Sequence, residues 1–142
     1  MTQITTNDAR LTRALRDSWC AETSAYETWS PDRPSAGQCA VTALVIQDHL
    51  GGDLLRGVVS GESHYWNRLP DSREVDLTSE QFEEFVLDAP PELRDRDYVL
   101  SFAPTAERYR ILAQRVRNHL LAQRRRPAFA DAPDSPEVHD AL

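Results

Sequence analysis

The chain of 142 residues has no long apolar run and fewer basic than acidic side chains. Its longest apolar stretch, residues 39–46, is interrupted by Thr42 and is far shorter than the roughly 20 residues that cross a bilayer. Sixteen Lys and Arg residues against 23 Asp and Glu residues give a net charge of −7. This charge disfavours non-specific binding to nucleic acid or to an anionic membrane. The sequence therefore predicts no nucleic-acid partner and no membrane partner.

Cysteine is also scarce, with only Cys20 and Cys39 in the chain. The N-terminus shows neither the basic start nor the apolar stretch of an export signal, so we expect a cytoplasmic protein with reduced thiols. A Cys20–Cys39 disulfide is the alternative. The length suits one domain over residues 1–126, followed by a mostly disordered acidic tail, 127–142, that is rich in proline. The sequence does not indicate an oligomeric state.

The pattern of apolar residues predicts an α+β fold. Apolar spacing indicates an amphipathic helix over 8–28, and a nearly all-apolar segment that stops at Gly51-Gly52 indicates a buried helix over 38–50. Short connections favour an antiparallel meander of three strands. Those strands are expected at 54–59, 63–69 and 73–77, followed by a helix over 78–88, a strand at 98–102 and a helix over 104–125.

Three residues in this pattern suggest chemistry: Cys39, His64 and Asp76. Cys39 is expected in the first turn of the buried helix, where unpaired backbone N–H groups favour a thiolate and could hold an oxyanion. His64 on the second strand is placed to move a proton. Asp76, twelve positions later across a tight turn, can reach the imidazole and fix its tautomer. This order predicts a Cys-His-Asp triad.

Four further residues are candidates for the oxyanion or substrate site. Gln38 could add an amide donor beside the cysteine, and Asn67 is a substitute for Asp76, although it falls on the opposite strand face from His64. Trp66 and Trp19 could form walls of a pocket, with core packing as the alternative for both. Structural roles are also open for Cys39 and His64. A zinc site built from Cys39, His64 and Asp76 is a further alternative, although the chain has no paired-ligand motif.

The same residues carry two resemblances. Ser63–Leu69, a turn, and then Val75-Asp76-Leu77 resemble the strand pair of papain-like and transglutaminase-like cysteine enzymes, which include the arylamine N-acetyltransferases. In that resemblance Cys39, His64 and Asp76 match the nucleophile, the base and the orienting residue. It implies a papain/transglutaminase-like core, with N-terminal helices packed on a small antiparallel sheet and a C-terminal helix.

The narrower resemblance is to the YunG-like family of small bacterial proteins. It rests on Trp29-Ser30-Pro31, Gly37–Leu44, Gly52–Gly57, Ser63–Leu69 and Asp76-Leu77-Thr78 and covers roughly residues 19–112. That family implies a fold but no settled substrate. Together the residues and resemblances predict a cysteine hydrolase or acyl/amide transferase that needs no cofactor and acts on a small amide, ester or thioester. The alternative is a catalytically silent module of the same fold that binds a small molecule or a protein.

Overall fold

The computed structural model describes residues 6–125 and has the predicted α+β organisation; the expected acidic tail, 127–142, lies outside the described residues. Two long helices come first, separated by a 3₁₀ turn, and a third long helix ends the described part. The elements in order are α1 (Thr6–Ser18), η1 (Ala21–Thr23), α2 (Cys39–Leu50), β1 (Asp53–Val59), β2 (Glu62–Arg68), β3 (Glu74–Val75), η2 (Ser79–Gln81), β4 (Glu92–Arg94), α3 (Arg96–Leu100) and α4 (Ala103–Arg125).

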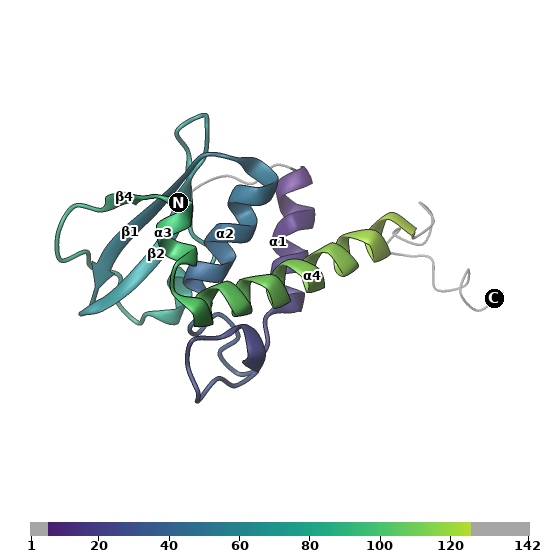
Figure 1. Cartoon of the computed structure of the whole chain (residues 1–142), viewed down its shortest axis with the longest axis horizontal. Coiled ribbons are helices and arrows are strands. Elements are labelled where there is room, and N and C mark those ends of the chain that lie inside the picture. Colours follow the sequence, from purple (N-terminus) through teal and green to yellow (C-terminus); the bar gives the residue numbers. More distant parts are fainter. Residues whose placement is uncertain (1–5, 126–142) are drawn as a thin grey trace.

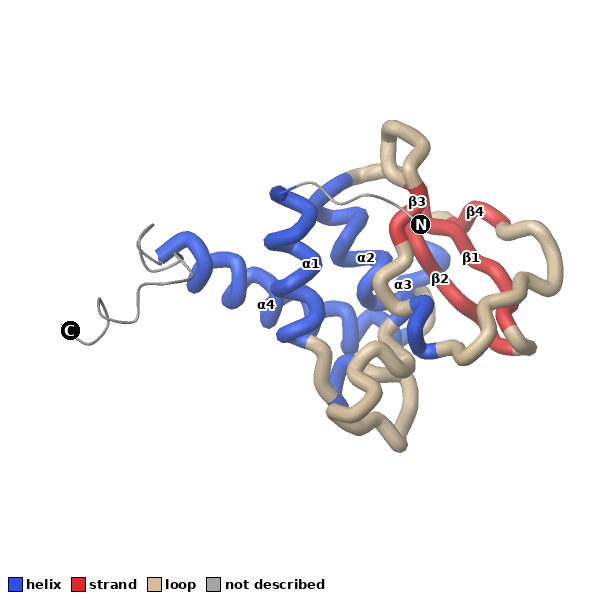
Figure 2. The backbone as a smooth tube through the Cα atoms, turned by 180° about the vertical axis from the view of Figure 1, so that it is seen from behind, coloured by secondary structure: helices blue, strands red, loops and turns tan. Residues whose placement is uncertain are grey.

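The sheet lies at one end of the molecule and α1 at the other, with α2 between them (Figures 1 and 2). The strand order is β3-β2-β1-β4, and every neighbouring pair is antiparallel. Helix α4 crosses both α1 and α2 on the side away from the sheet (Figure 1). No helix within residues 6–125 is both long and apolar enough to cross a membrane.

The buried helix predicted over 38–50 is confirmed as α2. Residues 41–46 are all buried, because one side of α2 packs on the sheet and the other on α1 and α4. The helix ends where predicted, at Gly51, whose positive φ of 76° suits glycine and whose N–H bonds to the carbonyl of Gln47. This packing fixes the direction of α2 and therefore the position of its first residue, Cys39.

The predicted meander is also confirmed. The first two strands agree with β1 and β2 to within one residue, and their register places Gly57 opposite His64. The third strand is shorter than predicted, since β3 has only two residues, Glu74 and Val75. Asp76 therefore lies immediately after the strand and not on it. The fourth strand, β4, was missed because it is three residues long and mostly exposed at the sheet edge.

Three other predictions are wrong in their details. The first helix ends at Ser18 and not near residue 28, because Cys20 is extended and begins a 3₁₀ turn closed by a bond between its carbonyl and Thr23. The segment 98–102 is not a strand. Its first part belongs to α3, where Val99 is buried while Tyr98 and Phe102 are exposed, a burial pattern that one helical turn satisfies.

The predicted helix over 78–88 is also wrong, because only the 3₁₀ turn η2, Ser79–Gln81, forms there. Phe82 and Phe85 turn toward the sheet, and their rings lie 5.0 and 5.4 Å from the ring of His64. These contacts hold the segment in an irregular conformation over the part of β2 that carries His64. The tertiary contacts of the two aromatic rings thus outweigh the helical sequence pattern.

Candidate active site

Cys39 is the first residue of α2 and has a partly exposed side chain. Gly37, two positions before Cys39, has a φ of 71° and lies so close to the 24–26 loop that an added Cβ would be 2.4 Å from the hydroxyl of Ser24. A bond from the N–H of Ala25 to the carbonyl of Gly37 holds this crossing together. The thiol is therefore presented at a helix start, where the unpaired N–H groups favour negative charge.

His64 and Asp76 form a buried pair. Nε2 of the imidazole lies 2.7 Å from Oδ2 of Asp76, and both side chains are almost completely inaccessible to solvent. The other carboxylate oxygen, Oδ1, accepts bonds from the N–H and the hydroxyl of Thr78. The carboxylate is thus fixed on both sides and holds the imidazole with Nε2 toward the acid.

Cys39 also acts on His64, because its side chain and its charge both raise the pKa of the imidazole. Burial alone would lower the pKa of His64, but the hydrogen bonds to Asp76 and Cys39 and the charges on both groups raise the pKa to about 9. Since Nε2 faces Asp76, Nδ1 is the nitrogen available to the thiol. The structure thus joins His64 to Asp76, and the role of Cys39 beside this pair stays a prediction.

Gln81 is a residue of this site that the sequence interpretation did not select. Its Oε1 accepts the N–H of Gly37 at 3.1 Å, and its Nε2 lies 3.4 Å from Nδ1 of His64. The side chain therefore bridges the start of α2 and the imidazole. The backbone carbonyl of Gln81 in turn accepts a bond from the guanidinium of Arg33. In the sequence, Gln81 completes a helix-capping pattern with Thr78, and this pattern predicts a structural role for Gln81.

Aromatic rings enclose the imidazole. Trp66, two residues along the same strand face, stacks at 5.6 Å from the His64 ring, and Phe82 and Phe85 approach it edge-on. Gly57 makes room for this packing, because a Cβ there would lie 2.6 Å from Leu87 and 3.0 Å from Trp66. The rings exclude water from the His64–Asp76 pair and strengthen its electrostatic interaction.

The remaining predicted site residues make other contacts. Gln38 is buried and donates its amide to the carbonyl of Cys20, and Asn67 donates its amide to the carbonyl of Ala43 on the opposite face from His64. Trp19 is buried in the main core and donates to Thr42, one turn along α2 from the cysteine. These three residues position α2. Among the four oxyanion or substrate candidates, only Trp66 contacts the imidazole.

Two cavities lie near the start of α2, and neither is lined by Cys39, His64 or Asp76. One of about 740 Å³ is lined by Ala36, Gln81 and Glu62, among others, and therefore reaches the amide that touches His64. Glu62 also accepts a bond from Tyr26, whose pKa is raised to about 12 by burial and by the adjacent negative groups, Cys39 among them. A second cavity of about 400 Å³ begins at Ala40, the residue after the cysteine. Their sizes are those of small-molecule sites.

The structure also bears on the two alternatives for the cysteines. Both Cys20 and Cys39 are free thiols, so no disulfide joins them. Within the described residues, no three side chains of the His, Cys, Asp and Glu types are grouped in a way that could hold a metal ion. The geometry around Cys39, His64 and Asp76 therefore does not favour the zinc alternative.

Comparison with known sequences shows the family of the chain. The sequence model described as "YunG protein" matches residues 7–121, which is most of the chain and nearly all of its described part. The chain belongs to the YunG family. A YunG relative from Bacillus subtilis (strain 168), the "Uncharacterized protein YunG", is 44% identical over 69 residues. That match covers 49% of this chain and 57% of the relative. No solved structure matches the chain.

Proposed function

We propose that this YunG-family protein is a cysteine hydrolase or acyl/amide transferase that acts on a small amide, ester or thioester. The observation that carries the proposal is the buried 2.7 Å contact between His64 and Asp76, together with the effect of Cys39 on the pKa of the same imidazole. A thiol, an imidazole and a carboxylate in this order are the groups that a nucleophilic cysteine requires. In this role Cys39 is the nucleophile, His64 the base and then the acid, and Asp76 the orienting residue.

The first chemical step forms a thioester. The pKa of His64, about 9, favours an imidazolium near neutral pH, and this cation stabilises a thiolate on Cys39. The sulfur attacks the substrate carbonyl carbon, and the C–S bond forms as the carbonyl π electrons move onto oxygen. When the tetrahedral intermediate collapses, the bond to the leaving group breaks, and Nδ1–H donates its proton to that group.

The second step releases the acyl group. Nδ1, now unprotonated, removes a proton from water or from an acceptor amine or alcohol as it attacks the thioester. Collapse of the second intermediate expels the thiolate of Cys39 and restores the starting state. Asp76 keeps Nε2–H directed toward itself, so Nδ1 is left for both proton transfers.

The oxyanion of both intermediates would be held by two kinds of donor. The first is the backbone N–H at the start of α2, where the helix dipole adds to the attraction. The second is the amide of Gln81, which replaces Gln38 in this role because the Gln38 amide is bound to Cys20. Movement of the Gln81 amide from Nδ1 to the oxyanion would also free the imidazole for the thiol.

The substrate is expected to be small. The cavity of about 740 Å³ is lined by Gln81, whose amide lies 3.4 Å from Nδ1 of His64, and its size suits a small substrate. A helix-borne cysteine packed against an antiparallel sheet also supports the likeness to papain-like and transglutaminase-like enzymes. In this proposal the chain is a compact relative of those enzymes.

The test is the pH dependence of Cys39 alkylation by iodoacetamide in a Cys20→Ser background, which leaves one thiol. We expect labelling below pH 8 to be faster than that of a free cysteine, and His64→Ala to slow it by about tenfold or more. Gln81→Ala is the matched variant: it removes the amide that lies nearest to Nδ1 and should leave labelling at least as fast. Circular dichroism checks that each variant is folded.

One observation favours the second candidate function, a binding module without catalysis. The imidazole of His64 is completely buried under aromatic rings, as a structural histidine often is. Labelling of Cys39 no faster than a free thiol, with no effect of His64→Ala in a folded variant, would exclude the hydrolase or transferase and favour this module.

A further inference from the structure

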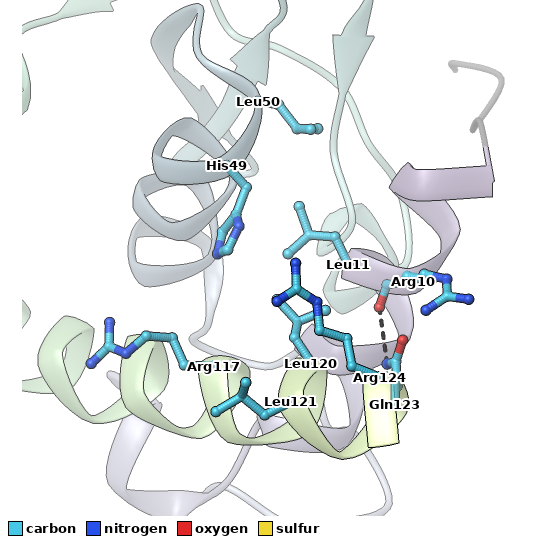
Figure 3. Close-up of a pocket in the computed structure, with 9 residues that line it drawn as sticks. All are labelled: Arg10, Leu11, His49, Leu50, Arg117, Leu120, Leu121, Gln123 and Arg124. Carbon is cyan, nitrogen blue, oxygen red and sulfur yellow. Dashed lines mark hydrogen bonds between the residues drawn. The ribbon is translucent and has the colours of Figure 1, made fainter. Parts of the chain in front are cut away.

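A groove lies at the other end of α2 from Cys39, between the C-terminal turn of that helix, α1 and the end of α4 (Figure 3). Its volume is about 690 Å³. Leucines from all three helices form its apolar lining: Leu11, Leu50, Leu120 and Leu121. Leu121 is 45% exposed, which makes it one of the more exposed large apolar side chains of the described part. The groove can therefore contact hydrocarbon.

The charged groups that line the same groove are all basic. They are Arg10, Arg117, Arg124 and the ionisable His49, and no acidic side chain of the described part lines it. Figure 3 shows Arg124 reaching inward over Leu120, toward the space between His49 and Leu11, whereas Arg10 and Arg117 project toward the two sides. One guanidinium is thus directed into the apolar part of the groove. In a protein with a net charge of −7, such a local excess of positive charge is unusual.

The arginines of the groove also differ from most others in their partners. Arg13, Arg16, Arg68, Arg94, Arg96 and Arg110 each form a salt bridge with a carboxylate. Among the residues that the structure describes, neither Arg10 nor Arg124 has a carboxylate partner, and Arg117 bonds only to the amide oxygen of Gln114. The charge of Arg124 is therefore available to a ligand.

From the leucine lining and the inward guanidinium of Arg124, which has no carboxylate partner among the described residues, we infer that this groove binds a small amphiphilic anion, namely a carboxylate that carries a medium-length hydrocarbon chain. One guanidinium can bind one carboxylate through two parallel hydrogen bonds. The hydrocarbon chain would lie on the four leucines and remove them from water. The bond from Gln123 to the carbonyl of Arg10 joins α4 to α1 and keeps the groove in shape.

This site is separate from the one around Cys39. The two lie at opposite ends of α2, and at 1.5 Å per residue the helix from Cys39 to Leu50 places them roughly 16 Å apart. The inference therefore does not rest on the proposed function. Each can fail without the other, because alkylation of Cys39 and binding in the groove are measured independently.

The test is calorimetric titration of the full chain with dodecanoate, kept below its micelle concentration. We expect saturable binding of one dodecanoate per chain, and Arg124→Gln should weaken it about tenfold, as loss of one charge-assisted contact does. Arg108→Gln is the matched control, since Arg108 is on the same helix, does not line the groove and has no carboxylate partner among the described residues. Dodecanol tests the need for the negative charge.

Amide chemical-shift changes locate the bound anion. Shifts at Leu11, Leu50 and Leu121 on addition of dodecanoate would support the groove. The inference is overturned if dodecanoate does not bind the full chain, if Arg124→Gln and Arg108→Gln bind it equally, if dodecanol binds as tightly, or if the shifts lie elsewhere. The exposed Leu121→Gln variant provides a second test: it should weaken binding while the far-ultraviolet circular dichroism stays unchanged.

Discussion

His64 has a different partner at each ring nitrogen. Asp76 accepts from Nε2, the amide of Gln81 lies 3.4 Å from Nδ1, and the rings of Trp66, Phe82 and Phe85 pack around the imidazole. The buried carboxylate of Asp76 stabilises a positive imidazole here, whereas burial alone would favour the neutral ring. The same pair therefore has consequences for stability as well as for chemistry.

We predict that His64 makes the stability of the protein depend on pH. Its folded pKa, about 9, lies above the ordinary value of 6.5, so protonation favours the folded state. The contribution is complete below about pH 6.5 and is lost as the pH rises through 9. The free energy of unfolding, measured with urea at pH 6 and pH 9.5, should fall by roughly 1–3 kcal/mol more in the parent than in His64→Gln. Equal changes in the two proteins would contradict this.

At the scale of elements, α2 and the first two strands could be predicted because each is defined by its own sequence. The apolar run 39–46 with its glycine stop has no other favourable place than the core, and β1 and β2 are bounded by turns. The segment after Asp76 could not be predicted in this way. Its conformation depends on contacts of Phe82 and Phe85 with His64 and on the hydrogen bond between Gln81 and Gly37. His64 and Gly37 are both distant from this segment in the sequence.

The same reasoning applies to the residues of the candidate site. Cys39, His64 and Asp76 lie on or beside regular elements, so their order along the chain suggested their proximity. Gln81 lies in a 3₁₀ turn whose path is set by tertiary packing, so no local pattern pointed to it. The oxyanion candidate was placed on Gln38 because that residue adjoins the cysteine, but its amide is used to hold Cys20.

Gly37 lies just before α2 and contacts both the 24–26 loop and Gln81, and we predict that it tolerates no side chain. A Cβ there would be 2.4 Å from the Ser24 hydroxyl and 2.9 Å from the backbone nitrogen of Tyr26. Gly61→Ala is the control, because Gly61 also has a positive φ but has open space around it. Gly37→Ala should therefore lower the free energy of unfolding by about 1–3 kcal/mol more than Gly61→Ala does, as judged from urea denaturation. Similar losses would show that the close approach is relieved easily.

At the scale of the whole molecule, one partly buried hydrogen-bond network joins the segment after the sheet to the helices. Arg96 of α3 donates to the carbonyl of Leu44 and to Gln47 on α2, and to Asp48 on the same helix at 2.6 Å. It also contacts the hydroxyl of Tyr109 on α4, which in turn donates to Asp48. A single guanidinium thus joins α2, α3 and α4, and α2 carries both Cys39 and one side of the basic groove.

We predict that this network contributes far more to stability than an exposed ion pair does. Arg96→Ala leaves Asp48 and the Leu44 carbonyl short of a donor at a partly buried site, so the free energy of unfolding should fall by about 1.5–3 kcal/mol. Arg110→Ala removes an exposed pair with Glu107 on α4 and should cost less than about 0.5 kcal/mol. Urea denaturation at low and high salt separates the two contributions, since salt screens the exposed pair much more than the enclosed one. If Arg96→Ala cost no more than Arg110→Ala, α3 would be held by apolar contacts of Val99 alone.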